Sequence, residues 1–130
     1  MKYVILIHSN PQPWGHPTSD YLPEYASVSA EGRRQMDLDF DAMLSELSAA
    51  GELVGGEALA DPSAARLYRW RDGAALTTDG PYSESKEHLA GFFLIDVESQ
   101  ERAEAIAGKF SGPGETVELR PAMWSGGDDA

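Results

Sequence analysis

The chain has 130 residues, of which 22 are acidic, 10 are Lys or Arg and 3 are His, so its formal net charge is -12 at pH 7. This length favours one domain, and 42% hydrophobic with 25% charged residues is the composition of a folded domain rather than of a disordered chain. The absence of cysteine excludes a disulfide scaffold, a thiol nucleophile and a thiolate metal site. Nucleic acid and anionic membranes both require a cationic surface, so we expect neither among its partners.

The apolar runs are too short for targeting or for a membrane span. Residues 3–7 are shorter than the core of a signal peptide, and polar residues follow them without a cleavage pattern. Residues 89–95 have the length of a strand. We therefore expect a cytoplasmic protein with a single domain, residues 1–124, and a flexible acidic C-terminal tail, residues 125–130.

The first half of the chain predicts a strand, a long loop and a helix. Residues 3–7 are continuously apolar and predict a strand buried on both faces. Five prolines and glycines between Asn10 and Tyr25 exclude a regular helix, and loops of this length often serve function. Ser27 or Ser29 then caps a helix that Gly51 ends. Its apolar stripe, interpreted as ordinary core, consists of Met36, Phe40, Met43, Leu44 and Leu47.

The second half predicts five more strands and a second helix. A strand over 52–59 contains the pair Gly55-Gly56, and Asp72-Gly73 between residues 66–71 and 74–78 is the signature of a β-hairpin. A strand over 88–97 follows. Ser99 caps a short helix, and residues 116–121 form a last strand.

Without the hairpin, the order is βαββαβ, which predicts an α+β ferredoxin-like fold with two helices on one face of an antiparallel sheet. The middle strands of such a sheet should alternate apolar and polar residues, because one face meets water. Residues 3–7 and 89–95 are instead apolar at successive positions. The uncovered face therefore needs a cover, and a second copy related by two-fold symmetry would supply it. We predict a homodimer.

The segment Thr78-Asp79-Gly80-Pro81-Tyr82-Ser83-Glu84-Ser85-Lys86-Glu87, followed by Gly91-Phe92-Phe93-Leu94-Ile95-Asp96-Val97, resembles the DGPF branch of the YCII-related family. The opening residues 1–7 and the segment 53–59 are also similar to that branch. The resemblance covers nearly the whole chain except the proline-rich loop and the tail. It implies a dimeric α+β barrel of ferredoxin-like subunits, in agreement with the independent argument from the sheet.

What the resemblance implies about function is limited. The branch is largely uncharacterised, and some members are encoded beside extracytoplasmic-function-type sigma factors. Typical YCII proteins are proposed to be enzymes that use a His-Asp pair, with the His near the start of the first long helix. That position falls near Phe40 here, and residues 30–50 contain no histidine, so the pair cannot be carried over. Tyr82 replaces the usual Phe of the motif.

In the antiparallel plan, one edge of the sheet gathers the ends of two strands and the start of a third, together with the loop and the Asp79 turn. A histidine beside a carboxylate can exchange protons near neutral pH, because the carboxylate orients the ring. The candidate catalytic residues at this edge are His8, Glu57, Asp79 and His88. The candidate ligand-binding residues are His16, Tyr82, Lys86 and Glu87.

Each candidate also has a structural interpretation. His8 can end a strand, Asp79 can close an Asx turn before Gly80-Pro81, and Tyr82 can be a packing ring.

No compact metal motif, phosphate loop or Gly-x-Ser-x-Gly elbow occurs in the sequence, so we expect neither a metal nor an organic cofactor. Arg66 to Arg71 alternates bases with aromatics as single-strand binders do, but pairing with acidic side chains suits the net charge better.

Two functions remain as hypotheses. The first is a protein that binds a small molecule in a cleft at the strand edge under the loop 10–25, with or without cofactor-independent acid-base catalysis. The second is a non-catalytic accessory or regulatory partner of an extracytoplasmic-function-type sigma factor. The sequence does not decide between them.

Overall fold

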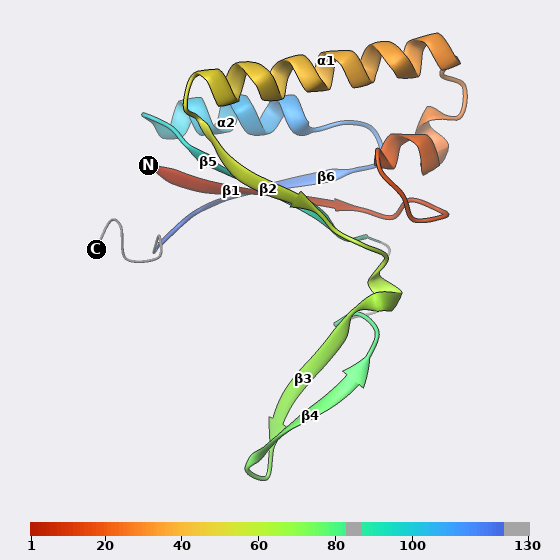
Figure 1. Ribbon diagram of the computed structural model, residues 1–130, viewed down its shortest axis with the longest axis vertical. Helices are drawn as coiled ribbons and strands as arrows, with labels where there is room; N and C mark the ends of the chain where they lie inside the picture. The colour runs from red at the N-terminus through yellow and green to blue at the C-terminus, as the bar shows by residue number, and fades with distance from the viewer. Residues whose placement is uncertain (83–86, 124–130) are drawn as a thin grey trace.

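The computed structural model describes residues 1–82 and 87–123 (Figure 1). Its elements in chain order are β1 (Lys2–Ser9), η1 (Thr18–Tyr21), η2 (Pro23–Tyr25), α1 (Ala30–Ala49), β2 (Leu53–Ala58), η3 (Pro62–Ala64), β3 (Arg66–Arg71), β4 (Ala74–Asp79), β5 (His88–Asp96), α2 (Gln100–Phe110) and β6 (Thr116–Pro121). Four strands form an antiparallel sheet in the order β2-β5-β1-β6, and both helices lie on one face of it (Figure 1). The predicted α+β ferredoxin-like fold with an inserted hairpin is confirmed.

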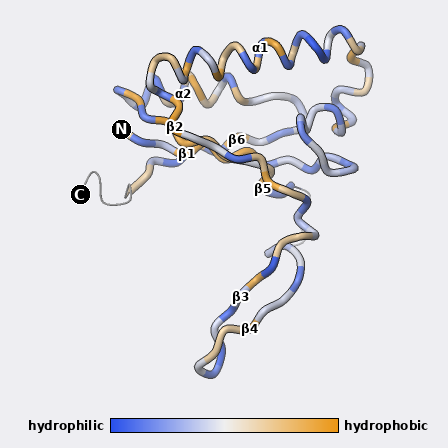
Figure 2. Tube along the Cα trace, viewed as in Figure 1, coloured by the Kyte–Doolittle hydropathy of each residue, from blue (hydrophilic) through white to orange (hydrophobic). Residues whose placement is uncertain are grey.

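Both helices begin at the serine caps expected from the sequence. The Ser29 hydroxyl accepts a hydrogen bond from the Gly32 amide at 3.0 Å, and the Ser99 hydroxyl accepts one from the Arg102 amide at 3.1 Å. Each bond satisfies an amide that has no partner within its own helix. Hydrophobic and hydrophilic residues alternate in bands along α1, as expected for a helix with one face toward the protein (Figure 2).

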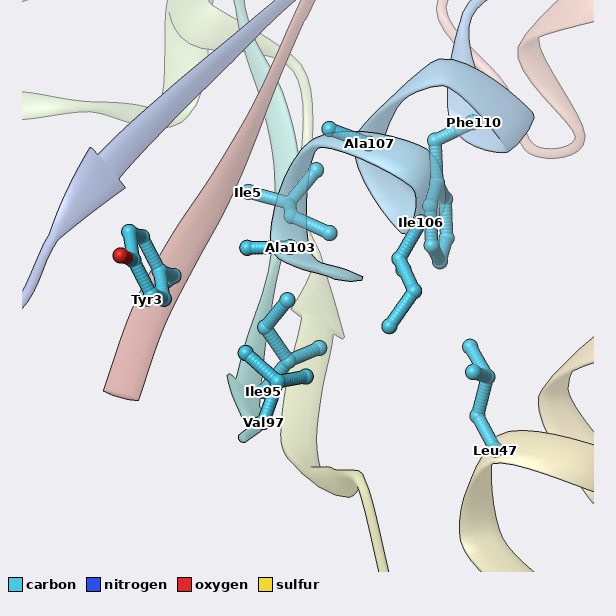
Figure 3. Packing of buried hydrophobic residues seen from close by; sticks show 9 residues of the cluster. All are labelled: Tyr3, Ile5, Leu47, Ile95, Val97, Ala103, Ile106, Ala107 and Phe110. Carbon is cyan, nitrogen blue, oxygen red and sulfur yellow. The ribbon is translucent and has the colours of Figure 1, made fainter. Parts of the chain in front are cut away.

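The hydrophobic core lies between the sheet and α2. Ile5, Ile95 and Ile106 are fully buried, and Figure 3 shows their side chains pointing toward one another from β1, β5 and α2. From α1, only Leu47 is buried among them, with Met43 and Leu44 packed at the edge. The interpretation of the whole α1 stripe as ordinary core therefore needs correction, because its remaining two members, Met36 and Phe40, line a cavity.

No helix of the described residues lies on the opposite face of the sheet (Figure 1). Val4 lies opposite Leu94 and Leu6 opposite Phe92 in the β1–β5 register, and all four side chains are half-buried. Residues directly opposite each other project from the same face of a sheet. We call these four residues the uncovered face.

The hairpin of β3 and β4 projects away from the sheet (Figure 1). Asp72 (φ 53°) and Gly73 (φ 81°) both adopt the left-handed conformation that a two-residue hairpin turn requires, as predicted. Tyr68 and Trp70 remain 66% and 75% exposed. Their alternate spacing places both rings on one face of the ribbon.

Candidate functional site

A cavity of about 490 Å³ lies between the sheet, the N-terminal half of α1 and the end of α2. This volume is within the range of small-molecule sites. Its lining comprises Ile7, Ala90, Gly91 and Phe93 of the central strands, Glu57 and Ala58 of β2, Met36, Asp37 and Phe40 of α1, Phe110 at the end of α2, Ser111 and Gly112 after it, His16, Pro17, Thr18, Ser19 and Tyr25 of the loop, and Glu115.

Three phenylalanine rings form a continuous apolar wall of this cavity. The ring centroids of Phe93 and Phe110 are 4.7 Å apart, and Phe40 contacts Phe110 at 5.7 Å and Phe93 at 6.3 Å, both edge to face. Such arrangements are favourable for aromatic pairs and hold the rings in defined positions. The wall joins α1, α2 and β5.

The proline-rich loop forms the second wall, and it is tied to the rest of the domain at both ends. The Trp14 indole and the His16 ring each donate a hydrogen bond of 2.9 Å to the Leu59 carbonyl just after β2. The Arg33 guanidinium of α1 bonds the Tyr25 carbonyl at 2.7 Å and the Asp20 carboxylate at 3.0 Å. The loop is therefore a fixed side of the cavity in this structure.

Glu115 contributes a half-buried carboxyl to the lining of the cavity. Burial raises the pKa of Glu115, and the Glu87 carboxylate adds to the increase, whereas Thr18, Ser9 and His16 act in the lowering direction. Thr18 donates a hydrogen bond of 2.8 Å to Oε2 of Glu115. The fully buried Ser9 hydroxyl lies close enough to affect this carboxyl, although its geometry does not meet that of a hydrogen bond to any described residue.

Tyr25 lies beside this carboxyl and is 8% exposed. Burial raises the pKa of its hydroxyl, and the carboxylates of Glu115 and Glu24 raise it further. A side chain at Gly112 would begin 2.6 Å from the Tyr25 hydroxyl, so only glycine leaves room for the ring here. Tyr25 therefore keeps its proton at neutral pH and is available as a hydrogen-bond donor.

The predicted candidates His16 and Glu57 both line the cavity. Glu87 accepts a hydrogen bond of 3.0 Å from Thr116, and its charge acts on the pKa of Glu115. His88 is half-buried opposite Ser9 in the β1–β5 register. The structure thus gathers these four candidates at one edge of the sheet, around or next to the cavity.

The other candidates lie elsewhere. His8 projects from the face that carries no helix, with Nε2 at 3.1 Å from Oε1 of Glu118 rather than from a predicted carboxylate. Asp79 pairs with Arg66 at 3.3 Å where the hairpin begins and ends, and both side chains are exposed. Tyr82 is 79% exposed, with the Arg69 guanidinium 5.8 Å from its ring centre. Lys86 lies outside the described residues.

Sequence reasoning missed Glu115, Tyr25, Thr18 and Asp37. The signal for Glu115 was nevertheless present, because the start of β6 must lie beside the end of β1 in this topology. Thr116 pairs with His8 in the observed register, which brings the preceding residue to the same edge. The start of β6 therefore lies at the same edge as the ends of β1 and β2 and the start of β5.

Among residues 1–82 and 87–123, no group of three or more His, Asp or Glu side chains is arranged to hold a metal ion. No helix of this part of the chain has the length and apolarity needed to cross a membrane.

The fold and the cavity define a small ferredoxin-like α+β domain with an acidic site between the sheet and its helices. The YCII-related domain matches residues 1–115, and the chain belongs to this family. It is also 32% identical, over 104 residues, to an uncharacterized protein of Rhizobium meliloti strain 1021. That match covers 77% of this chain and 84% of the relative.

Proposed function

We propose that the protein binds a small, mainly apolar molecule in this cavity and exchanges a proton with it through Glu115. The observation that supports this proposal is one half-buried carboxyl on the lining of a mainly apolar cavity. Cavities with mostly apolar walls and a few converging polar groups are the usual form of small-molecule sites. A titratable group whose pKa is shifted by burial in such a site is a candidate for acid-base chemistry.

The chemistry needs only groups of this chain. A raised pKa brings Glu115 closer to the working pH, where a carboxylate accepts a proton and later returns it most efficiently. Tyr25 can donate a hydrogen bond to an oxygen of the bound molecule as charge develops there. Thr18 holds the carboxyl in place through its hydrogen bond. Proton transfer of this kind requires no organic cofactor.

We also infer that the working form is a homodimer in which two uncovered faces pack together. The supporting observation is that the half-buried apolar side chains of β1 and β5 meet no helix on that face. Two sheets that pack face to face bury such side chains between them. A two-fold axis makes the same patch serve both copies.

Partial filling of the cavity tests the proposal directly. In Ala58→Phe, a large ring is added to an exposed lining residue of the edge strand β2. The neutral fluorescent probe N-phenyl-1-naphthylamine should gain fluorescence with the wild-type protein, and Ala58→Phe should weaken its binding about tenfold or more, equivalent to roughly 1.4 kcal/mol. Fluorescence titration at fixed protein concentration measures both affinities.

The matched control is Ala42→Phe, which adds the same ring at an exposed α1 position outside the cavity lining. Equal binding by both variants and the wild type would contradict the cavity as the binding site. A wild-type protein that binds no probe, and that carries no retained molecule in native mass spectrometry, would favour a non-catalytic partner role.

The pH dependence of stability tests the state of Glu115. Its pKa is raised above the ordinary value of 4.5, so the folded chain holds this proton more tightly than the unfolded chain does. Ionisation therefore costs folding free energy as the pH rises through the folded-state pKa. Glu115→Gln should raise the Tm at about pH 8 and lose this advantage toward about pH 3, where both states of the wild type are protonated.

Differential scanning fluorimetry across this pH range measures the difference. Glu46→Gln removes an equal charge from an exposed position on α1 outside the cavity and should show no such pH-dependent gain. A Glu115→Gln variant whose Tm difference from the wild type is constant with pH would contradict the raised pKa.

A further inference from the structure

The charged groups of the cavity all have one sign. Its lining includes the carboxylates of Asp37, Glu57 and Glu115, and it includes no Lys or Arg among the described residues. The side chains of Asp37 and Glu57 are exposed, whereas that of Glu115 is half-buried. A ligand with a phosphate or carboxylate group would bring its charge beside these carboxylates at an electrostatic cost, and the His16 ring is the one group on the described lining that could offset it when protonated.

The guanidinium of Arg33, which contacts two lining residues, does not change this balance. Arg33 contacts the backbone of Ser19 and Tyr25, which line the cavity, but its donors are directed to their carbonyls, to the Val28 carbonyl and to the Asp20 carboxylate. These bonds hold the loop against α1. The guanidinium is therefore committed to the wall and is not presented to the interior.

The aromatic walls also suit an organic amine. Phe40, Phe93 and Phe110 contact one another along one side, and the Tyr25 ring lies on the lining as well. The face of an aromatic ring carries negative electrostatic potential, and sites built from several rings with a carboxylate recognise ammonium groups.

We propose that the molecule bound in this cavity is an amine, with an apolar or aromatic body against the phenylalanine wall and a protonated amino group against Glu115. This inference rests on the proposed function and names the chemical class of its ligand. The ammonium group pairs with the half-buried carboxylate of Glu115. Contact between the apolar body and the phenylalanine wall removes both apolar surfaces from water.

Binding is then linked to protonation. Glu115 must be ionised to pair with the ammonium group. The charged or titratable groups that act on Glu115, or lie beside it, are His16, Glu87, Tyr25 and Glu24. Amine affinity should rise with pH as Glu115 loses its proton, and fall again as the amine itself deprotonates near about pH 10, the range of a lysine amino group.

Three probes of nearly equal size test the charge preference: 2-phenylethylamine, 2-phenylethanol and phenylacetate. Isothermal titration of the wild-type protein at neutral pH should give an affinity for the amine about tenfold or more above that for the alcohol, with phenylacetate weakest. Glu115→Gln should reduce the preference for the amine over the alcohol to near unity. Glu46→Gln, with the same net charge, should retain it.

The outcomes separate the two proposals. If phenylacetate or the alcohol binds as tightly as the amine, or if none of the three binds although the naphthylamine probe does, the amine assignment is overturned and the cavity remains a binding site. Equal loss of amine preference in Glu115→Gln and Glu46→Gln would show attraction by net charge alone and also overturn the assignment. If no probe of either set binds the wild type, both proposals fail together.

Discussion

Replacing Leu94 with Asp is expected to dissociate the proposed homodimer into single chains of 14.1 kDa. Leu94 lies on the uncovered face, opposite Val4 on one neighbouring strand and Gly55 on the other. If two such faces pack together, the new carboxylate is enclosed among apolar side chains without a partner. An uncompensated buried charge costs about 3–5 kcal/mol, enough to dissociate a dimer at micromolar concentration.

Sedimentation equilibrium at several protein concentrations measures this change. Leu38→Asp is the control, because it introduces the same side chain at an α1 position that is already 56% exposed. It should leave the mass unchanged. A wild-type protein that sediments as a single chain at micromolar concentration would end the dimer inference, as would a Leu94→Asp variant that remains dimeric.

The largest loss of folding free energy is expected for Ile5→Ala. Ile5 is fully buried at the centre of β1 and belongs to the core cluster with Ala103 and Ile106 of α2. Removing three carbon atoms there leaves a void that the packed sheet and helix fill only in part. Substitutions of this kind cost about 2–5 kcal/mol, a large part of the 5–15 kcal/mol typical of a domain.

Urea denaturation followed by circular dichroism gives this loss as a lower midpoint. Leu38→Ala removes a comparable volume from an exposed site and should change the free energy of unfolding by no more than about 0.5 kcal/mol. Equal effects of the two substitutions would show that the core does not lie where the structure places it.

The fold could be predicted because its signals are local. The cap at Ser99, the turn at Asp72-Gly73 and the alternation over residues 116–121 each depend on a few adjacent residues. Topology then follows from the order of elements, since few arrangements accommodate βαββαβ. The dimer and the predicted partnership with a sigma factor depend on other chains and stay predictions.

The cavity could be predicted only in part, because it depends on how far α1 stands from the sheet. Phe40 and Leu47 share one apolar stripe, and periodicity cannot tell which of them reaches the core. Likewise, the position of the Glu115 carboxyl is fixed by a hydrogen bond from Thr18, which lies 97 residues earlier in the chain. The partner of His8 is Glu118, and neither the charge nor the spacing of the acidic residues distinguishes it from the alternatives.

The hairpin of β3 and β4 extends the domain beyond its sheet and helices. Each strand has six residues, so at about 3.3 Å per residue the ribbon extends roughly 20 Å beyond its root. Its tip at Asp72-Gly73 stands clear of the sheet (Figure 1), so changes there leave the packing of the body intact. Evolution can therefore alter what the tip touches, by length or by side chain, without redesigning the core or the cavity. In this architecture, contact with neighbours and recognition of a small molecule can diverge independently.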